Sequence, residues 1–190
     1  MPSPARSTHV ALLRGINVGG KNRLPMAALA EIFTAAGCRN VRTYIQSGNV
    51  VFAAGPKAAE RIPAVVARAI RASHGLEVPV VLRSSEELRG VVARNPFLKK
   101  RVDPQSLHVA FLADAPERSR GASLDPERSP GDSFVLRGRE IYLHLPKGVG
   151  KSKLTNAWFD SKLGTTSTLR NWRTVLELLD MAHAPDPSER

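Results

Sequence analysis

The sequence has few of the residues that form disulfides or membrane spans. Cys38 is the single cysteine among 190 residues, so an intrachain disulfide is excluded. No apolar run approaches the ~20 residues that a membrane-spanning helix needs. The first nine residues also carry no apolar stretch of the kind found in signal peptides. We therefore expect a cytoplasmic protein without membrane association.

Catalytic and metal-binding groups are scarce as well. The five histidines are dispersed, and His9, His108 and His144 fall within expected strands. The sequence has no cysteine or carboxylate cluster with metal-ligand spacing, so we expect no metal and no cofactor. Ser47 lacks the glycine pattern of a nucleophile elbow. A hydrolase is therefore hard to assemble from these residues.

Acidic residues are few, because 17 Asp and Glu stand against 28 Lys and Arg, which gives a net charge of +11. The excess is concentrated in two segments. Residues 14–49 hold five basic side chains and one Glu, and residues 147–173 hold six and one Asp. This pattern favours an anionic partner such as nucleic acid or a nucleotide. The alternative is a basic composition that serves no anionic partner.

The first half of the chain predicts a complete small fold. Hydrophobic spacing and turn residues indicate the order strand, helix, strand, strand, helix, strand. The strands are expected over residues 9–13, 41–46, 50–53 and 78–82, and the helices over residues 25–37 and 56–74. This order is that of the ferredoxin-like fold (split βαβ, or alpha-beta plait), with two helices on one face of an antiparallel sheet. A short helix capped by Ser84 should follow. The first unit is therefore expected to span residues 1–94.

An internal repeat predicts a second unit over residues 95–190. His108–Leu112 (HVAFL) repeats His9–Leu13 (HVALL), and a second hairpin is expected around residues 137–139. Helices are expected over 152–163 and 169–183, with Ser167 or Thr168 as the cap of the latter. Because no strand is expected after them, the second unit is predicted to be an incomplete or modified copy. The expected fold class is α+β with two ferredoxin-like subdomains.

A glycine-rich loop from Gly15 to Gly20 joins the first strand to the first helix. Such a loop lets backbone N–H groups approach an anion. Its GxxxGG spacing differs from the GxGxxG fingerprint of dinucleotide sites. The alternative is that the glycines only permit a tight path. The neighbouring side chains favour a polar ligand, and they are Arg14, Asn17, Lys21 and Asn22.

Two basic stretches in the second half are weaker candidates. LPKGVGKS, residues 145–152, resembles a P-loop but has Leu145 where a P-loop requires glycine. Lys151 remains a candidate anion contact near a helix start, and an ordinary hairpin-to-helix connection is the alternative. In TLRNWRT, Arg170 and Arg173 flank Trp172, which stacks on a base if exposed and anchors the core if buried. Helical spacing favours a buried Trp172 with exposed arginines.

Three motifs together resemble the bacterial family called domain of unknown function 1697. They are ALLRGINVGGKNRLPM, VRTYIQSGNVVF and, near the end of the chain, TLRNWRTVLEL. The resemblance covers roughly residues 10–179. It implies a two-part α+β fold with ferredoxin-like subunits, and it implies no reaction.

We expect a composite site that joins the glycine loop, the Ser47 hairpin and the start of the Arg170 helix. Its ligand should bear phosphate, with nucleic acid as the first candidate. The alternatives are an enzyme acting on a small anionic metabolite or nucleotide, and an assembly module that pairs through sheet edges; a monomer and a homodimer are both open. The expected ligand-binding residues are Arg14, Gly15, Asn17, Gly19, Gly20, Lys21, Asn22, Tyr44, Gln46, Ser47, Asn49, Lys151, Arg170, Asn171 and Arg173.

Overall fold

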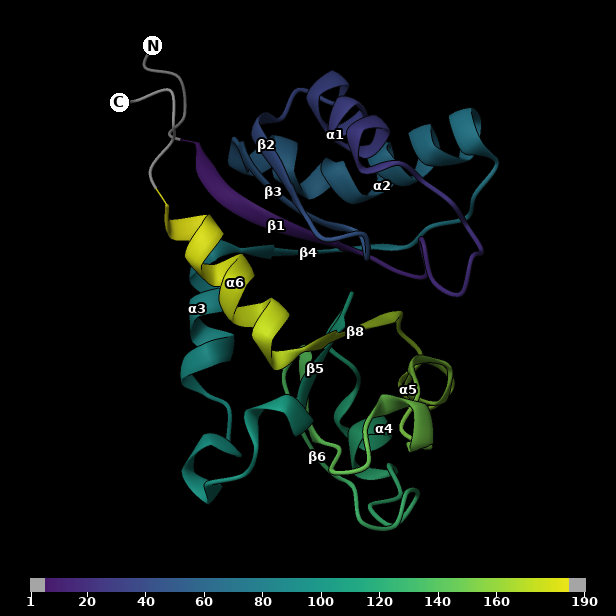
Figure 1. Cartoon of the computed structure of the whole chain (residues 1–190), viewed down its shortest axis with the longest axis vertical. Coiled ribbons are helices and arrows are strands. Elements are labelled where there is room, and N and C mark those ends of the chain that lie inside the picture. Colours follow the sequence, from purple (N-terminus) through teal and green to yellow (C-terminus); the bar gives the residue numbers. More distant parts are fainter. Residues whose placement is uncertain (1–5, 185–190) are drawn as a thin grey trace. The chain divides into compact units, whose positions relative to one another are not determined.

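The computed structural model describes residues 6–184 and contains two α+β units, each built on a four-stranded antiparallel sheet (Figure 1). The first unit takes the chain up to Arg89 together with the residues from Glu177 onwards, and the second unit is Gly90–Leu176. The expected division after residue 94 placed the whole of the last helix in the second unit. In the structure, the boundary falls within two helices instead.

The first unit follows the predicted order of strands and helices. Its sheet has the order β2-β3-β1-β4, and α1 and α2 cover one face (Figure 1). The chain continues after the last strand into α3, which begins in this unit. The elements are β1 (Ser7–Leu13), α1 (Met26–Ala35), β2 (Arg39–Tyr44), β3 (Asn49–Ala54), α2 (Pro56–His74), β4 (Val80–Ser84) and α3 (Ser85–Ala93).

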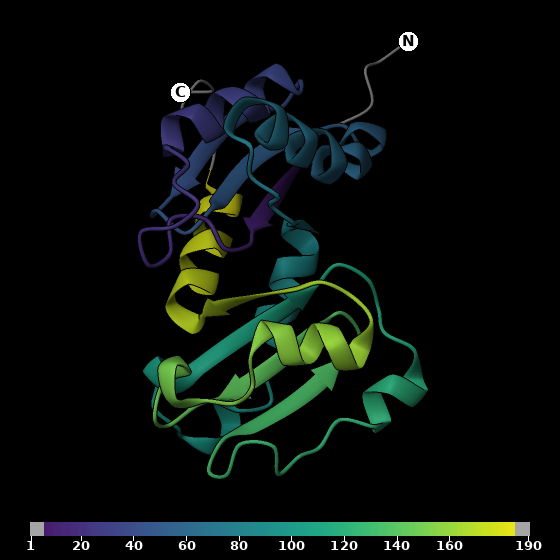
Figure 2. The same cartoon turned by 90° about the vertical axis from the view of Figure 1, so that its right-hand side faces the viewer.

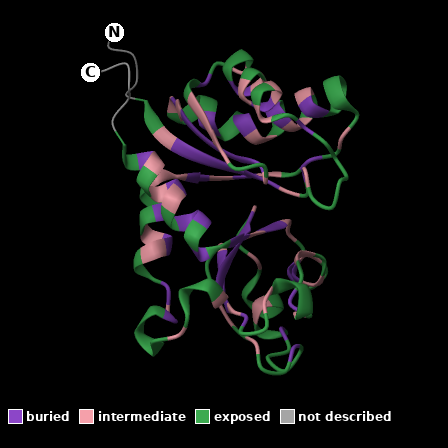
Figure 3. Cartoon of the chain, in the orientation of Figure 1, coloured by how far each residue is buried: buried purple, intermediate pink, exposed green. Residues whose placement is uncertain are grey.

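The two central strands of the first sheet, β1 and β3, are largely buried on both faces. On the helix face, Leu13 and Phe52 of the sheet pack with Phe33 of α1 and Val66 of α2. Val10 and Leu12 alternate with these residues on β1, so they point to the opposite face, and they are also fully buried. Figure 3 shows the buried part of this strand in purple. Because both faces are buried, β1 and β3 read as continuous apolar runs rather than as alternating patterns.

The second unit has the sheet order β6-β7-β5-β8, and α5 lies across one face of that sheet (Figure 2). Phe159 and Leu163 of α5 pack there against Leu112 and Leu143. Its elements are β5 (Leu107–Leu112), α4 (Arg118–Ala122), β6 (Ser133–Arg137), β7 (Glu140–His144), α5 (Asn156–Leu163), β8 (Ser167–Asn171), α6 (Trp172–His183) and the short 3-10 helices η1 (Leu98–Lys100), η2 (Pro104–Ser106) and η3 (Val149–Lys151).

The prediction that the second unit lacks its last strand is wrong. Residues 167–171 form β8, which pairs with β5 so that Arg170 lies opposite Val109. The last helix therefore begins at Trp172 rather than at residue 169, and its cap is Asn171, whose side-chain oxygen accepts from the Thr174 N–H at 2.8 Å. Pairing with β5 overrides the helical spacing of Leu169 because it satisfies the backbone groups of both strands.

The repeat extends beyond the two matching first strands. At the end of β1, the Leu13 N–H donates to the Gly48 carbonyl at 2.8 Å and the Arg14 N–H to the Pro79 carbonyl at 3.0 Å. At the end of β5, the N–H groups of Leu112 and Ala113 donate in the same way to the carbonyls of Arg139 (2.9 Å) and Thr166 (2.8 Å). Each half of the chain is therefore a βαββαβ copy that is followed by one further helix.

That further helix is divided between the units in both copies. The later part of α6 belongs to the first unit, where the Arg42 Nη2 donates to the Met181 carbonyl at 2.6 Å. The later part of α3 belongs to the second unit, where the Tyr142 hydroxyl donates to the Val91 carbonyl at 3.0 Å. Each of these bonds lies within the unit to which that part of the helix belongs.

No helix within residues 6–184 has both the length and the apolar character needed to cross a membrane.

A reciprocal cap begins α3, as the sequence predicts for Ser84. The Ser84 hydroxyl accepts from the Glu87 N–H at 3.1 Å, and a Glu87 carboxylate oxygen accepts from the Ser84 N–H at 2.8 Å. We expect Ser84→Ala to lower the free energy of unfolding by about 1 kcal/mol, measured by urea denaturation. Ser85→Ala is the control, and an equal loss in both variants would contradict the assignment of the cap.

Candidate functional site

The connection between β1 and α1 follows a tightly wound path. Five of the residues from Gly15 to Asn22 have positive φ angles, and they are Gly15, Asn17, Gly19, Gly20 and Asn22. Val18 and Lys21 form a small antiparallel bridge, and Gly19 and Gly20 (φ 58° and 75°) make the turn between them. The loop is therefore a miniature hairpin that projects from the end of β1.

Asn17 holds this hairpin in place. Its side-chain oxygen accepts from the Leu24 N–H at 2.8 Å, and its Nδ2 donates to the carbonyls of Leu24 (2.8 Å) and Gln46 (2.9 Å). Asn22 closes the base of the loop, because its Nδ2 donates to the Gly15 carbonyl at 2.9 Å and its carbonyl accepts from the Asn17 N–H at 3.1 Å. Both asparagine side chains are thus used to shape the loop.

The β2-β3 connection is the neighbour that Asn17 reaches. It consists of residues 45–48, whereas the sequence predicted a turn at residues 47–49. Asn49 is the first residue of β3, is fully buried, and donates from Nδ2 to the Tyr44 carbonyl (3.1 Å) and the Ser47 hydroxyl (3.0 Å). Its expected role as a ligand contact is corrected to a structural one, because no part of its side chain meets solvent.

The two connections leave one continuous group of residues exposed. We call Val18–Arg23 together with Ile45 and Gln46 the loop surface; the Asn17–Gln46 hydrogen bond joins its two parts. Val18 is 63% exposed and Ile45 is 50% exposed. Neither Lys21 nor Arg23 forms an ion pair with any residue in the range 6–184. The loop surface thus combines unpaired cations with exposed aliphatic groups.

The remaining predicted residues of the first unit lie at the edge of the loop surface. Arg14, Tyr44 and Ser47 are half-buried, and Gly15 is exposed. Arg14 and Ser47 also take part in interactions within the protein. They support the two connections more than they extend the exposed surface.

The predicted residues of the second unit differ in their exposure to solvent. Lys151 is exposed in η3, and Arg173 is exposed in the first turn of α6. Arg170 was expected to be exposed, but it lies in β8 and is 7% exposed; burial lowers the pKa of its guanidinium to about 10. Trp172 is buried, as its helical spacing predicts. The predicted composite site draws on both units and stays a prediction.

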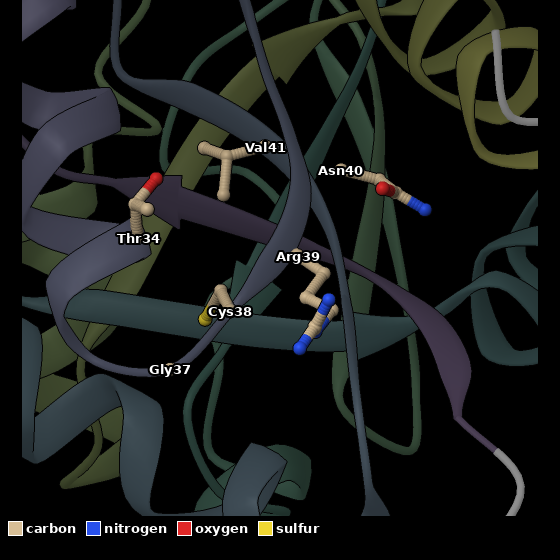
Figure 4. A pocket seen from close by; sticks show the side chains of 6 residues that line it. All are labelled: Thr34, Gly37, Cys38, Arg39, Asn40 and Val41. Carbon is tan, nitrogen blue, oxygen red and sulfur yellow. The ribbon is translucent and has the colours of Figure 1, made fainter. Parts of the chain in front are cut away.

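A cavity of about 500 Å³ lies beside α1 and the start of β2 (Figure 4). It is lined by Thr34, Gly37, Cys38, Arg39, Asn40 and Val41. Cys38 is 3% exposed, and burial raises the pKa of its thiol to about 11. The Asn40 side chain points away from the Cys38 sulfur (Figure 4). Because the thiolate is the reactive form, Cys38 is unsuited to nucleophilic chemistry near neutral pH.

A second cavity, of about 630 Å³, lies in the second unit where the start of β5 meets the end of β8. It is lined by Pro104, Gln105, His108, Asn171, Trp172, Arg173 and Leu176. The sequence predicted Asn171 and Arg173 as site residues, but it did not predict that Pro104, Gln105 and His108 would line the same cavity. These come close only through the pairing of His108 with Asn171, which depends on the unpredicted strand β8.

Residues 6–184 contain no group of three or more His, Cys, Asp or Glu side chains placed to hold a metal ion.

Comparison with known proteins decides the family. A family model described as "Protein of unknown function (DUF1697)" matches residues 6–142, which is more than half of the sequence. The chain belongs to this family. The DUF1697 family carries no assigned reaction in that description, and no curated protein matches the chain.

A solved structure supports the same fold for this DUF1697 member. The chain is similar to the conserved bacterial protein SP0830 from Streptococcus pneumoniae, with a TM-score of 0.72 and 21% sequence identity. The match covers 94% of this chain and 99% of that one. Identity this low shows a shared fold across both units and does not transfer a function.

Gly48 is tightly packed at the point where the two loops meet. Its φ is +77°, and a Cβ there would lie 2.7 Å from the Leu13 Cβ and 2.9 Å from the Ile16 Cδ1. We expect Gly48→Ala to lower the free energy of unfolding by about 2–4 kcal/mol, through overpacking and an unfavourable left-handed backbone. In Gly150→Ala, where an added Cβ has no neighbour within 4 Å, the loss should stay small. Equal urea midpoints for the two variants would contradict this packing.

Burial of Cys38 has a chemical consequence that is simple to measure. Because burial favours the protonated thiol and shields it, iodoacetamide should modify the folded protein at pH 8 at least about a hundredfold more slowly than the urea-unfolded protein. Mass spectrometry reports the extent of alkylation. Equal rates in the two states would show that the thiol is accessible in the folded protein.

Proposed function

We propose that the first unit binds nucleic acid through the loop surface. The observation that carries this proposal is the pair of interlocked loops that displays Lys21 and Arg23, neither of which forms an ion pair with a described residue. The surroundings are short of negative charge, because Glu31 is the single acidic residue in the first 59 positions. Cations held in such a setting attract phosphates and release the counterions that surround a nucleic acid.

Backbone geometry supports the same proposal. Gly19 and Gly20 are exposed, and their left-handed conformations turn the chain so that phosphate groups can approach its N–H groups without side-chain hindrance. Asn17 and Asn22 fix this arrangement in advance, so little conformational entropy is lost when a ligand binds. Preorganisation of this kind favours binding of the phosphate backbone of a nucleic acid over binding of a single free ion.

Ile45 supports a role in contact with a ligand. A β-branched residue with φ +46° is strained by about 1–2 kcal/mol, yet the Ile45 side chain is half exposed and stabilises no core. Backbone strain of this size is characteristic of functional positions. Ile45 and Val18 would supply apolar contacts to sugars and base faces beside the cations.

We also propose that both units are ferredoxin-like modules, which the βαββαβ order and the matching sheet orders support. RNA-binding domains with this plan stack bases on an open sheet face. Here the central strands of the first sheet are buried on both faces, including Val10, Leu12 and Val51. Binding by the first unit is therefore assigned to its loops and not to its sheet.

The test is the salt dependence of binding to a single-stranded oligoribonucleotide, measured by fluorescence anisotropy. The double variant Lys21→Glu, Arg23→Glu should bind more weakly, and its slope of log K against log salt should be lower by about 1.4, since each lost contact to a single strand removes ~0.7. Lys57→Glu, Arg61→Glu changes the charge by the same amount on exposed positions of α2. If both double variants lost affinity equally, general charge and not the loop surface would be responsible.

A further inference from the structure

The cavity of the second unit has features that the nucleic-acid proposal does not use. Its volume of about 630 Å³ is within the range of pockets that hold small organic ligands. Its walls come from η2, from the paired ends of β5 and β8, and from the first turn of α6. A cavity supported by paired strands and a helix keeps its shape better than one formed by loops.

His108 supplies a buried polar group in this cavity. The residue is 8% exposed, and its Nδ1 lies 3.3 Å from the Ser106 carbonyl oxygen. A carbonyl can only accept, so Nδ1 carries the proton and Nε2 is left as an acceptor in the neutral ring. No residue within the described range 6–184 bonds to this Nε2. Burial also lowers the pKa of His108, which keeps the ring neutral at pH 7.

Positive charge and an aromatic ring line the same cavity. Arg173 is exposed and forms no ion pair with a described residue. The N–H groups of Trp172 and Arg173, in the first turn of α6, have no preceding helical carbonyl to bind. The Asp103 carboxylate, which precedes Pro104 in the chain, caps η2 by accepting from the Gln105 N–H at 2.9 Å. Trp172 also lines the cavity, although the residue as a whole is only 4% exposed.

The equivalent position in the first unit lacks these features. His9 pairs with Ser84 in the first sheet as His108 pairs with Asn171 in the second. The His9 Nε2 already has a partner, the Ser7 hydroxyl at 2.9 Å. Ser85 and Glu86 follow Ser84 where Trp172 and Arg173 follow Asn171, so a carboxylate replaces the cation. The repeat thus kept its backbone, while the second copy acquired an acceptor, an aromatic ring and a cation in one cavity.

We infer that this cavity binds a small ligand in which a planar ring with a hydrogen-bond donor is joined to an anionic group, the class to which nucleoside monophosphates belong. The anion would bind Arg173 and the free N–H groups of the first turn of α6. The ring would pack against the part of Trp172 that lines the cavity, and its amino or hydroxyl group would donate to His108 Nε2. This site is separate from the loop surface and does not depend on it.

The test uses adenosine 5′-monophosphate as the probe and the intrinsic fluorescence of Trp172. The protein has two tryptophans, so Trp158→Phe leaves Trp172 as the only reporter. Saturable one-to-one binding is expected, with adenosine alone and inorganic phosphate alone each at least ~10-fold weaker, because each lacks one of the two recognised parts. No fluorescence change up to millimolar probe, or phosphate binding as tightly as the nucleotide, would overturn the inference.

Three variants in the Trp158→Phe protein separate the contacts. Arg173→Gln should lower the affinity for the nucleotide about tenfold. Lys162→Gln makes the same charge change on an exposed position of α5 and should leave this affinity unchanged. His108→Asn keeps a donor for the Ser106 carbonyl but removes the Nε2 acceptor. It should therefore lower the affinity for adenosine and leave the affinity for inorganic phosphate unchanged. Equal affinities for Arg173→Gln and Lys162→Gln would overturn the site even if His108→Asn failed to fold. Lys21→Glu, Arg23→Glu should bind the nucleotide normally, which keeps this test distinct from that of the loop surface.

Discussion

The candidate nucleic-acid surface depends on the hydrogen bonds of one side chain, Asn17. Through them the loop after β1 is fixed both to its own end at Leu24 and to Gln46 in the β2-β3 connection. Without this clamp, a chain segment with five positive φ angles would have many alternative paths. The buried Ile16 and the close approach of Gly48 add packing to the same junction. Cations and aliphatic side chains are thereby displayed from a rigid base.

Duplication followed by divergence explains how one fold carries two different candidate sites. The two copies share strand order, the hydrogen bonds that end their first strands, and a capped helix after their last strands. The first copy has the glycine-rich loop, where the second has Ala113 and Asp114. The second copy has the cavity beside His108. Each copy is therefore proposed to hold its own site, in contrast to the single composite site that the sequence suggested.

The sequence predicts the first unit well because its signals are local. α2 begins at Pro56, ends at His74 and is stopped by Gly75, all of which follow from proline, glycine and hydrophobic spacing. β8 was missed because Leu169 and Trp172 also fit a helix, and only pairing with β5 decides between the two structures. The repeated Leu-Arg-Ser and Leu-Arg-Asn at residues 82–84 and 169–171 would have revealed the strand. The loop surface could be located from its residue types, but the structural use of Asn17, Asn22 and Asn49 could not, since asparagine serves turns and ligands alike.

The most direct test of the account is hydrogen-deuterium exchange of the intact protein with and without a single-stranded oligoribonucleotide. Binding should slow the exchange of residues 15–23 and 45–48, because the ligand covers the N–H groups of the loop surface. The amides of α2, on the helix face of the same unit, should be unchanged. Protection confined to α2 or to the second unit, with none in the two loops, would contradict the account.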